Sequence, residues 1–159
     1  MTIMPEDVPG VAVYHFGLVV ADLAGAVEQY SSALGFRFAK ARKIPLPVLV
    51  DGQPRSVELL ATYSTGGLPH LELIEELSGS TWAADAFGMN HMGFWAKDMA
   101  AAMARLEANG MPCRVRGTST PPSASPRMSY HQAETGAWIE LVDHSVRESL
   151  DAWLATTYG

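Results

Sequence analysis

The sequence has 159 residues, of which 48% are hydrophobic and 18% charged, and this balance excludes a disordered chain, a collagen-like repeat and a small disulfide-stapled protein. The formal net charge is −6 and no dense run of Lys and Arg exists, so neither nucleic acid nor an anionic membrane is an expected partner. With one cysteine and no apolar stretch long enough for a bilayer span or built as a signal peptide, we predict a cytoplasmic protein with a single domain over residues 1–159.

The first predicted element is a strand over residues 11–20, an apolar run rich in valine. Asp22 follows it and is placed to cap a helix, because its carboxylate can accept free backbone N–H groups. Apolar residues then recur at helical spacing, at Leu23, Val27, Tyr30 and Leu34. Gly35 stands where a left-handed residue would end this helix.

Three shorter strands are predicted next, over residues 36–41, 57–63 and 70–75. Residues 44–54 contain several prolines and are predicted to form a loop. The Ser-Thr-Gly-Gly run at residues 64–67 is predicted to form a hairpin turn between the last two strands.

The same order of elements follows in the second part of the chain. A strand is predicted over residues 89–96, then a helix capped by Asp98 and ended near Gly110. Further strands are predicted over residues 113–117, 127–133 and 137–143, with a proline-rich loop at 118–126. A final helix is predicted over residues 145–156, with Ser145 and Glu148 as a capping box and an apolar face of Val146, Leu150, Trp153 and Leu154.

The chain is an internal repeat. His15 and His91 each begin the pattern His-x-Gly, then four residues, then Asp and an apolar residue. The segment Leu-Glu-Leu-Ile around Glu72 likewise matches Ile-Glu-Leu-Val around Glu140. We therefore predict an α+β fold of two paired βαβββ half-modules, over about residues 11–77 and 89–144, followed by the C-terminal helix.

His15, Glu72, His91 and Glu140 occupy equivalent positions in the two halves and are predicted to bind a metal ion. An ionised carboxylate inside an apolar strand needs a cation or a hydrogen-bond partner, because burying it unpaired costs several kcal/mol, roughly. Two imidazoles and two carboxylates suit a divalent first-row metal. A single strand His or Glu is more often an ordinary core or edge residue, and the repetition is what favours the metal site.

These motifs resemble the vicinal oxygen chelate superfamily. The resemblance rests on the His-x-Gly strand and Asp-Leu start of His15–Leu23, the Leu-Gly-Phe at 34–36, the Asn-His start at 90–91, and the two Glu strands at 71–74 and 139–142. It covers roughly residues 11–144 and implies a glyoxalase-like fold. The superfamily includes glyoxalase I, methylmalonyl-CoA epimerase, extradiol dioxygenases, fosfomycin-resistance enzymes and bleomycin-binding proteins.

The resemblance also implies a ligand set. His15, Glu72, His91 and Glu140 match the His, Glu, His, Glu set of glyoxalase I, which would hold one ion of Zn, Ni, Co or Mn. Methylmalonyl-CoA epimerases often have Gln at the Glu72 position. Extradiol dioxygenases bind iron through a triad that His15, His91 and Glu140 could supply, and bleomycin-binding members lack the set. A homodimer is expected by analogy.

The predicted activity is a metal-dependent isomerase, epimerase or lyase that removes a proton next to a carbonyl and stabilises the resulting enediolate. Glu58 is the predicted base, since strand alternation places it on the face opposite Val57 and Leu59. Glu72 or Glu140, released from the metal, could serve instead. An acyl-CoA or a small carbonyl compound is the preferred substrate.

Two other functions stay open, an Fe(II)-dependent dioxygenase and a ligand-binding or resistance protein. Other polar residues carry weaker predictions. His70 could share the face of Glu72, and only one of Tyr130 and His131 can face the cleft. The basic residues Lys40, Arg42 and Lys43 either meet the phosphates of a CoA thioester or form a solvated edge.

Overall fold

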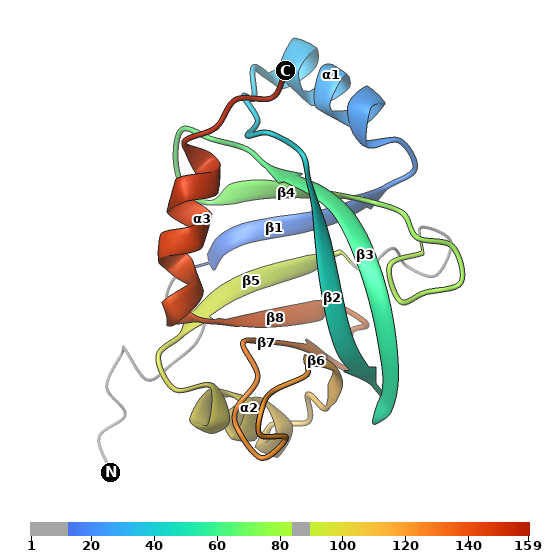
Figure 1. Cartoon of the computed structure of the whole chain (residues 1–159), viewed down its shortest axis with the longest axis vertical. Helices are drawn as coiled ribbons and strands as arrows, with labels where there is room; N and C mark the ends of the chain where they lie inside the picture. Colours follow the sequence, from blue (N-terminus) through green and yellow to red (C-terminus); the bar gives the residue numbers. More distant parts are fainter. Residues whose placement is uncertain (1–12, 84–89) are drawn as a thin grey trace.

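The computed structural model describes residues 13–83 and 90–159, whose strands close into a barrel made from two βαβββ halves (Figure 1). The first half contains β1 (Val13–Val20), α1 (Leu23–Leu34), β2 (Arg42–Val50), β3 (Gln53–Tyr63) and β4 (His70–Glu75). The second half contains β5 (His91–Ala96), α2 (Met99–Ala108), β6 (Cys113–Gly117), β7 (Met128–Gln132) and β8 (Trp138–Asp143). A 3-10 turn, His144–Val146, then leads into α3 (Arg147–Leu154). The predicted α+β, glyoxalase-like fold with a C-terminal helix is confirmed.

The strand order around the barrel is β1-β4-β3-β2-β6-β7-β8-β5. Within each half the first strand runs parallel to the last, β1 beside β4 and β5 beside β8. The halves join through two antiparallel pairs, β1 with β5 and β2 with β6. The first of these two pairs sets the two predicted His strands side by side at the centre of the molecule.

The helices α1 and α2 cover the outer faces of the strands that carry the glutamates, at opposite ends of the molecule (Figure 1). Leu73, beside Glu72, packs with Leu23 and Val27 of α1. Leu141, beside Glu140, packs with residues of α2 in the equivalent way. Because neighbouring strand residues point to opposite faces, both glutamates point into the barrel, as their apolar neighbours predicted.

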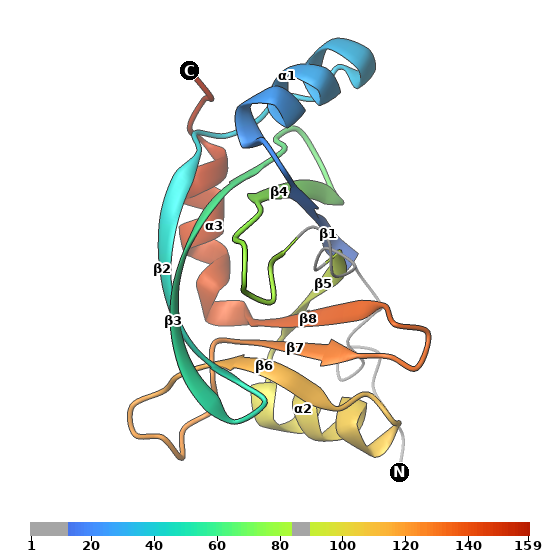
Figure 2. The same ribbon diagram turned by 90° about the vertical axis from the view of Figure 1, so that its right-hand side faces the viewer.

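The prediction for residues 36–54 was wrong. Residues 36–41 form only one isolated bridge, between Phe38 and Ser64, whereas the predicted loop is the strand β2 and the start of β3. The prolines fit β2 because their nitrogens face the β6 side, where the ladder between β2 and β6 begins only at Val48. The Pro47 carbonyl accepts a hydrogen bond from Thr118 on the β6 side, so the Pro47 nitrogen faces away from β3, and Pro45, two residues earlier, does the same. Figure 2 shows the long curved hairpin that β2 and β3 form.

The helix ends confirm part of the capping prediction. The Asp98 carboxylate accepts a hydrogen bond from the Ala101 backbone N–H at 3.0 Å, but Asp22 makes no such bond. Glu75 instead accepts from the Leu23 N–H at 3.0 Å. Gly35 and Gly110 have left-handed backbone angles, φ 75° and 79°, as predicted.

The C-terminal helix is shorter than predicted. It begins at Arg147 rather than at residue 145, and the Ser145–Glu148 capping box does not form. Asp143 accepts from the Ser145 N–H at 2.8 Å instead. The predicted strand starts at residues 11 and 89 lie outside the described residues. Among the helices of the described ranges, none combines the length and hydrophobicity needed to cross a membrane.

Candidate metal centre

The His-x-Gly motifs of the two halves interlock. Antiparallel pairing of β1 with β5 sets His15 opposite Gly93 and His91 opposite Gly17. The imidazole of each histidine lies over the glycine of the other half, so that a Cβ atom on either glycine would overlap the facing ring. The glycine of the motif is therefore needed to let the two histidines enter the barrel together.

Parallel pairing brings the glutamates to the same place. Gly17 is the register partner of Glu72, and Gly93 is the partner of Glu140. Since the glycines have no side chain, the neighbouring carboxylates share the space above them with the histidine rings. The repeat thus places four equivalent side chains around one point, each from a different strand.

All four side chains are buried, and their ligand atoms lie within 4.8 Å of one another. The two Nε2 atoms of His15 and His91 are 2.9 Å apart. Glu72 Oε2 lies 3.3 Å from His15 Nε2 and 3.1 Å from His91 Nε2. Glu140 Oε2 lies 3.0 Å and 3.1 Å from the same two nitrogens.

The charges of this cluster depend on one another. Burial by itself would lower the pKa of His91, but the nearby carboxylates of Glu140 and Glu72 outweigh burial and raise this pKa to about 10. The pKa of His15 is raised from its ordinary value for the same reason, against the opposing effect of burial. Burial would raise the pKa of Glu72 and Glu140, yet the two histidines lower both. The cluster thus holds its carboxylates ionised and attracts positive charge.

The donor set fits a divalent ion. Each Nε2 carries at most one proton, yet each faces two carboxylate oxygens and another nitrogen, so hydrogen bonds cannot satisfy every contact. Glu140 Oε2, although close to both nitrogens, accepts no well-aligned hydrogen bond from the described residues. Divalent metals bind imidazole nitrogen and carboxylate oxygen at about 2.0–2.2 Å, which sets neighbouring donors about 3 Å apart. His15, Glu72, His91 and Glu140 could therefore hold one such ion.

A cavity of about 470 Å³ opens above the carboxylates. Glu72 and Glu140 line its floor together with three tyrosines, Tyr14, Tyr63 and Tyr130. Burial, and secondarily the charges of the glutamates, raise the pKa of each tyrosine well above its ordinary value, so that the hydroxyls stay protonated.

Two of these tyrosines extend the repeat. Tyr63 pairs with Glu72 across β3 and β4, and Tyr130 pairs with Glu140 across β7 and β8. The Tyr63 ring meets His15 edge-on at 5.5 Å, and Tyr130 meets His91 at 5.1 Å. Strand alternation alone left open whether Tyr130 or His131 faces the cleft, and it did not identify Tyr63; the structure places Tyr130 in the cavity lining. The position of Tyr63 follows from its pairing with a glutamate that points inward, which single-strand alternation does not reveal.

Glu58 lies on the wrong face for its predicted role. Leu59 and Tyr63 of β3 line the cavity, so Glu58, the strand neighbour of Leu59, points to the opposite, outer face. The Glu58 side chain is 60% exposed and lies 3.8 Å from Lys43 Nζ. The predicted orientation of this strand is therefore wrong, because Leu59 and not Glu58 faces the cavity, and Glu58 has no role in the mechanism proposed below.

Other predicted residues also lie apart from the cluster. His70 is half-buried and its Nδ1 lies 2.9 Å from the Ser64 carbonyl oxygen. His131 turns away from the cavity toward the Met111 carbonyl. Lys40 does not line the cavity, and its backbone contacts the C-terminal segment: its carbonyl accepts from Trp153 Nε1 at 2.7 Å and its N–H donates to Thr156 Oγ1 at 2.9 Å. Arg42 and Lys43 do line the cavity.

Comparison with known proteins assigns the class. Residues 14–129 match the family described as the Glyoxalase/Bleomycin resistance protein/Dioxygenase superfamily, and the chain belongs to that superfamily. A search of curated proteins gives no match.

Solved structures show the same fold. Methylmalonyl-CoA epimerase from Mycobacterium tuberculosis is 22% identical, over 87% of this chain and 91% of that one, with a TM-score of 0.57. A hypothetical protein from Bacillus halodurans is 14% identical, over 82% and 92% of the two chains, with a TM-score of 0.59. A Streptomyces coelicolor methylmalonyl-CoA epimerase variant in complex with 2-nitronate-propionyl-CoA is 17% identical, over 83% and 96%, with a TM-score of 0.56. At these identities the likeness concerns the fold.

Proposed function

We propose that this protein is a divalent-metal-dependent isomerase, epimerase or lyase that removes a proton next to a carbonyl group. The observation that carries the proposal is the convergence of two histidines and two glutamates on the floor of a cavity. The epimerase neighbours support an enzyme of this kind, and an acyl-CoA or a small carbonyl compound is the preferred substrate.

In this proposal His15, Glu72, His91 and Glu140 hold one ion of Zn, Ni, Co or Mn. The ion supplies positive charge that polarises the carbonyl and stabilises the negative charge formed when the neighbouring proton leaves. The two carboxylates would cancel the formal charge of a divalent ion, and the burial of all four side chains would strengthen these electrostatic interactions.

The base is Glu72 or Glu140 in this mechanism, because these are the only carboxylates among the described residues that line the cavity. Either could accept the substrate proton on its carboxylate. Tyr63 and Tyr130 are the cross-strand partners of these glutamates and line the cavity with them, so their protonated hydroxyls can donate hydrogen bonds to the substrate oxygen that gains charge.

Proton exchange in deuterated water tests the proposal. The protein is loaded separately with Zn, Ni, Co and Mn and incubated with a panel of acyl-CoA thioesters and 2-oxo compounds. We expect metal-dependent loss of the proton signal at the carbon next to the carbonyl, detected by NMR. The absence of exchange with every metal and every compound would contradict the proposal.

An Fe(II)-dependent dioxygenase is the second candidate, because the His15, His91 and Glu140 triad is in place for iron. Oxygen consumption that requires Fe(II), with no proton exchange, would favour this reading. We also propose a cytoplasmic homodimer, from the free Cys113 and the family resemblance. Light scattering during gel filtration measures the mass of the assembly.

A further inference from the structure

The mouth of the cavity is basic, although the chain as a whole is acidic. The exposed residues that line the cavity are Arg42, Lys43, Pro45, Arg127 and Ser149, and three of these five are cations. We call them the rim. The whole chain has a net charge of −6, so a cluster of cations at the entrance runs against the average charge of the surface.

The two rim arginines differ from Lys43 in their charge partners. In the described ranges neither Arg42 nor Arg127 forms an ion pair, whereas Lys43 lies 3.8 Å from Glu58. The Arg42 guanidinium sits over the Trp153 ring at 5.1 Å. Trp153 is itself held by its hydrogen bond to the Lys40 carbonyl and by edge contact with Tyr63. Arg42 is therefore positioned by an aromatic face, with its N–H groups left to bind a ligand.

Between the rim and the floor the cavity is apolar. Its walls are Ile44, Leu46 and Leu59 from the β2–β3 hairpin, with Ile74, Met128 and Val142 from the other strands. The residues Val146, Leu150 and Trp153 of the C-terminal segment cover one side. No Asn or Gln side chain lines the cavity, so the walls offer few partners for a polyhydroxylated ligand.

We infer that the substrate has a reacting end that faces the metal, an apolar body, and an anionic group at the other end that binds Arg42 and Arg127. This inference rests on the proposed function, since the metal fixes the reacting end. The cavity of about 470 Å³ accommodates a compact ligand. The anion is a carboxylate of such a ligand, or a phosphate of a CoA thioester whose acyl arm enters through the rim.

Two matched chelators test the rim separately from the metal. Benzohydroxamate offers two vicinal oxygens on an apolar ring, and 4-carboxybenzohydroxamate adds only an anion at the far end. Calorimetric titration of the zinc-loaded protein should give roughly tenfold tighter binding of the carboxylated compound, because charge-assisted hydrogen bonds are the strong ones. Added salt should narrow this difference.

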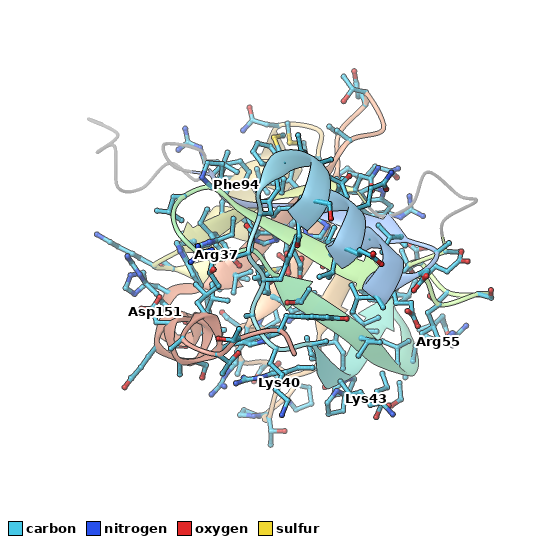
Figure 3. All side chains as sticks on the ribbon, turned by 90° about the horizontal axis from the view of Figure 1, so that it is seen from above. Arg37, Lys40, Lys43, Arg55, Phe94 and Asp151 are labelled. Atoms are coloured by element: carbon cyan, nitrogen blue, oxygen red, sulfur yellow. The ribbon has the colours of Figure 1, made fainter. Side chains whose placement is uncertain are left out.

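Substitutions of the rim arginines test whether these residues cause the difference in affinity between the two hydroxamates. We expect Arg127→Gln, alone or combined with Arg42→Gln, to make the affinities for the two hydroxamates nearly equal. The metal content of these variants should not change. Arg55→Gln is the matched control, because Arg55 is an exposed cation of the same hairpin that does not line the cavity (Figure 3). Arg127→Gln keeps the Arg42–Trp153 contact, so its result does not depend on the position of α3.

Equal affinity of the two compounds for the unaltered protein, or a ratio that survives the double variant, would overturn the inference. If hydroxamates bind equally well with and without metal, the proposed function fails instead. Competition with butyryl-CoA separates the two sources of the anion. If butyryl-CoA displaces 4-carboxybenzohydroxamate and this displacement needs the rim arginines, the arginines bind the phosphates of CoA. If it displaces nothing, they bind the carboxylate of a compact acid.

Discussion

The two halves of the barrel share one plan but differ in the hairpin that follows each helix. In the first half β2 and β3 span 9 and 11 residues, whereas β6 and β7 span 5 residues each. The His, Gly, Tyr and Glu of the centre occupy equivalent register positions in both halves. The long hairpin of the first half supplies more of the cavity lining than the short hairpin of the second half does, and it carries two of the three rim cations.

This difference separates two roles. The shared parts build the metal centre, where each half contributes one histidine and one glutamate and accepts the histidine of the other half over its glycine. The parts that differ shape the space above the centre. Matching substitutions at equivalent central positions of the two halves should therefore change metal affinity and stability equally. Matching substitutions outside the centre should change them unequally.

Replacing either glutamate by alanine should give the largest effect. Glu72→Ala and Glu140→Ala each remove one ligand, so metal affinity and turnover should fall together by about 100-fold or more, beyond the range seen for residues that only support a ligand. Elemental analysis and the exchange assay measure both quantities. Glu58→Ala is the control and should change neither. Full occupancy and full activity in Glu72→Ala would rule out the four-ligand site.

Adding a methyl group to either motif glycine should be the next largest change. Gly17→Ala and Gly93→Ala force the facing histidine ring to move, which should cost about 1–3 kcal/mol of folding stability and weaken metal binding. Gly117→Ala, in β6, is the control because its new methyl would meet Met128 at 3.5 Å, an ordinary contact. Chemical denaturation measures the stabilities. If Gly17→Ala and Gly93→Ala were as stable as Gly117→Ala, the interlocked packing of the histidines over the glycines would be wrong.

The metal-free protein should become less stable as the pH rises, because its histidines lose their protons. The pKa of His91 is raised from 6.5 to about 10 in the folded chain, so its stabilising contribution is complete below pH 6.5 and is lost as the pH rises toward 10. Thermal unfolding of chelator-treated protein should show this decline. Metal-loaded protein should resist it, because the ion takes the place of the protons. A metal-free protein that gains stability over this range would contradict the assigned shifts.

The smallest effects concern the two helix starts. Asp98→Ala should cost about 1 kcal/mol, because it removes a capping hydrogen bond from α2. Asp22→Ala should cost less, because the Asp22 carboxylate makes no capping bond and Glu75 binds the Leu23 N–H instead. Equal losses of unfolding free energy in the two variants would mean that Asp22 also caps its helix.

The repeat made the centre predictable, since equivalent positions of His and Glu imply convergence whatever the details of the strands. The face of Glu58 was not predictable, because alternation gives two faces and only the pairing of Tyr63 with Glu72 says which one is inside. The strand β2 was hidden by Pro45 and Pro47, whose nitrogens are harmless because they face the β6 side, where the ladder between β2 and β6 covers only Val48–Val50. Asp22 and Glu75 likewise show that a contact between distant strands can replace a local cap.

The most direct measurement is an anomalous difference map from crystals grown with zinc or cobalt, collected at the absorption edge of the metal. We predict one ion per chain, bound by Nε2 of His15, Nε2 of His91 and one carboxylate oxygen each of Glu72 and Glu140. No peak at saturating metal, or a peak that leaves these four side chains unbound, would contradict a metal centre shared equally by the two halves.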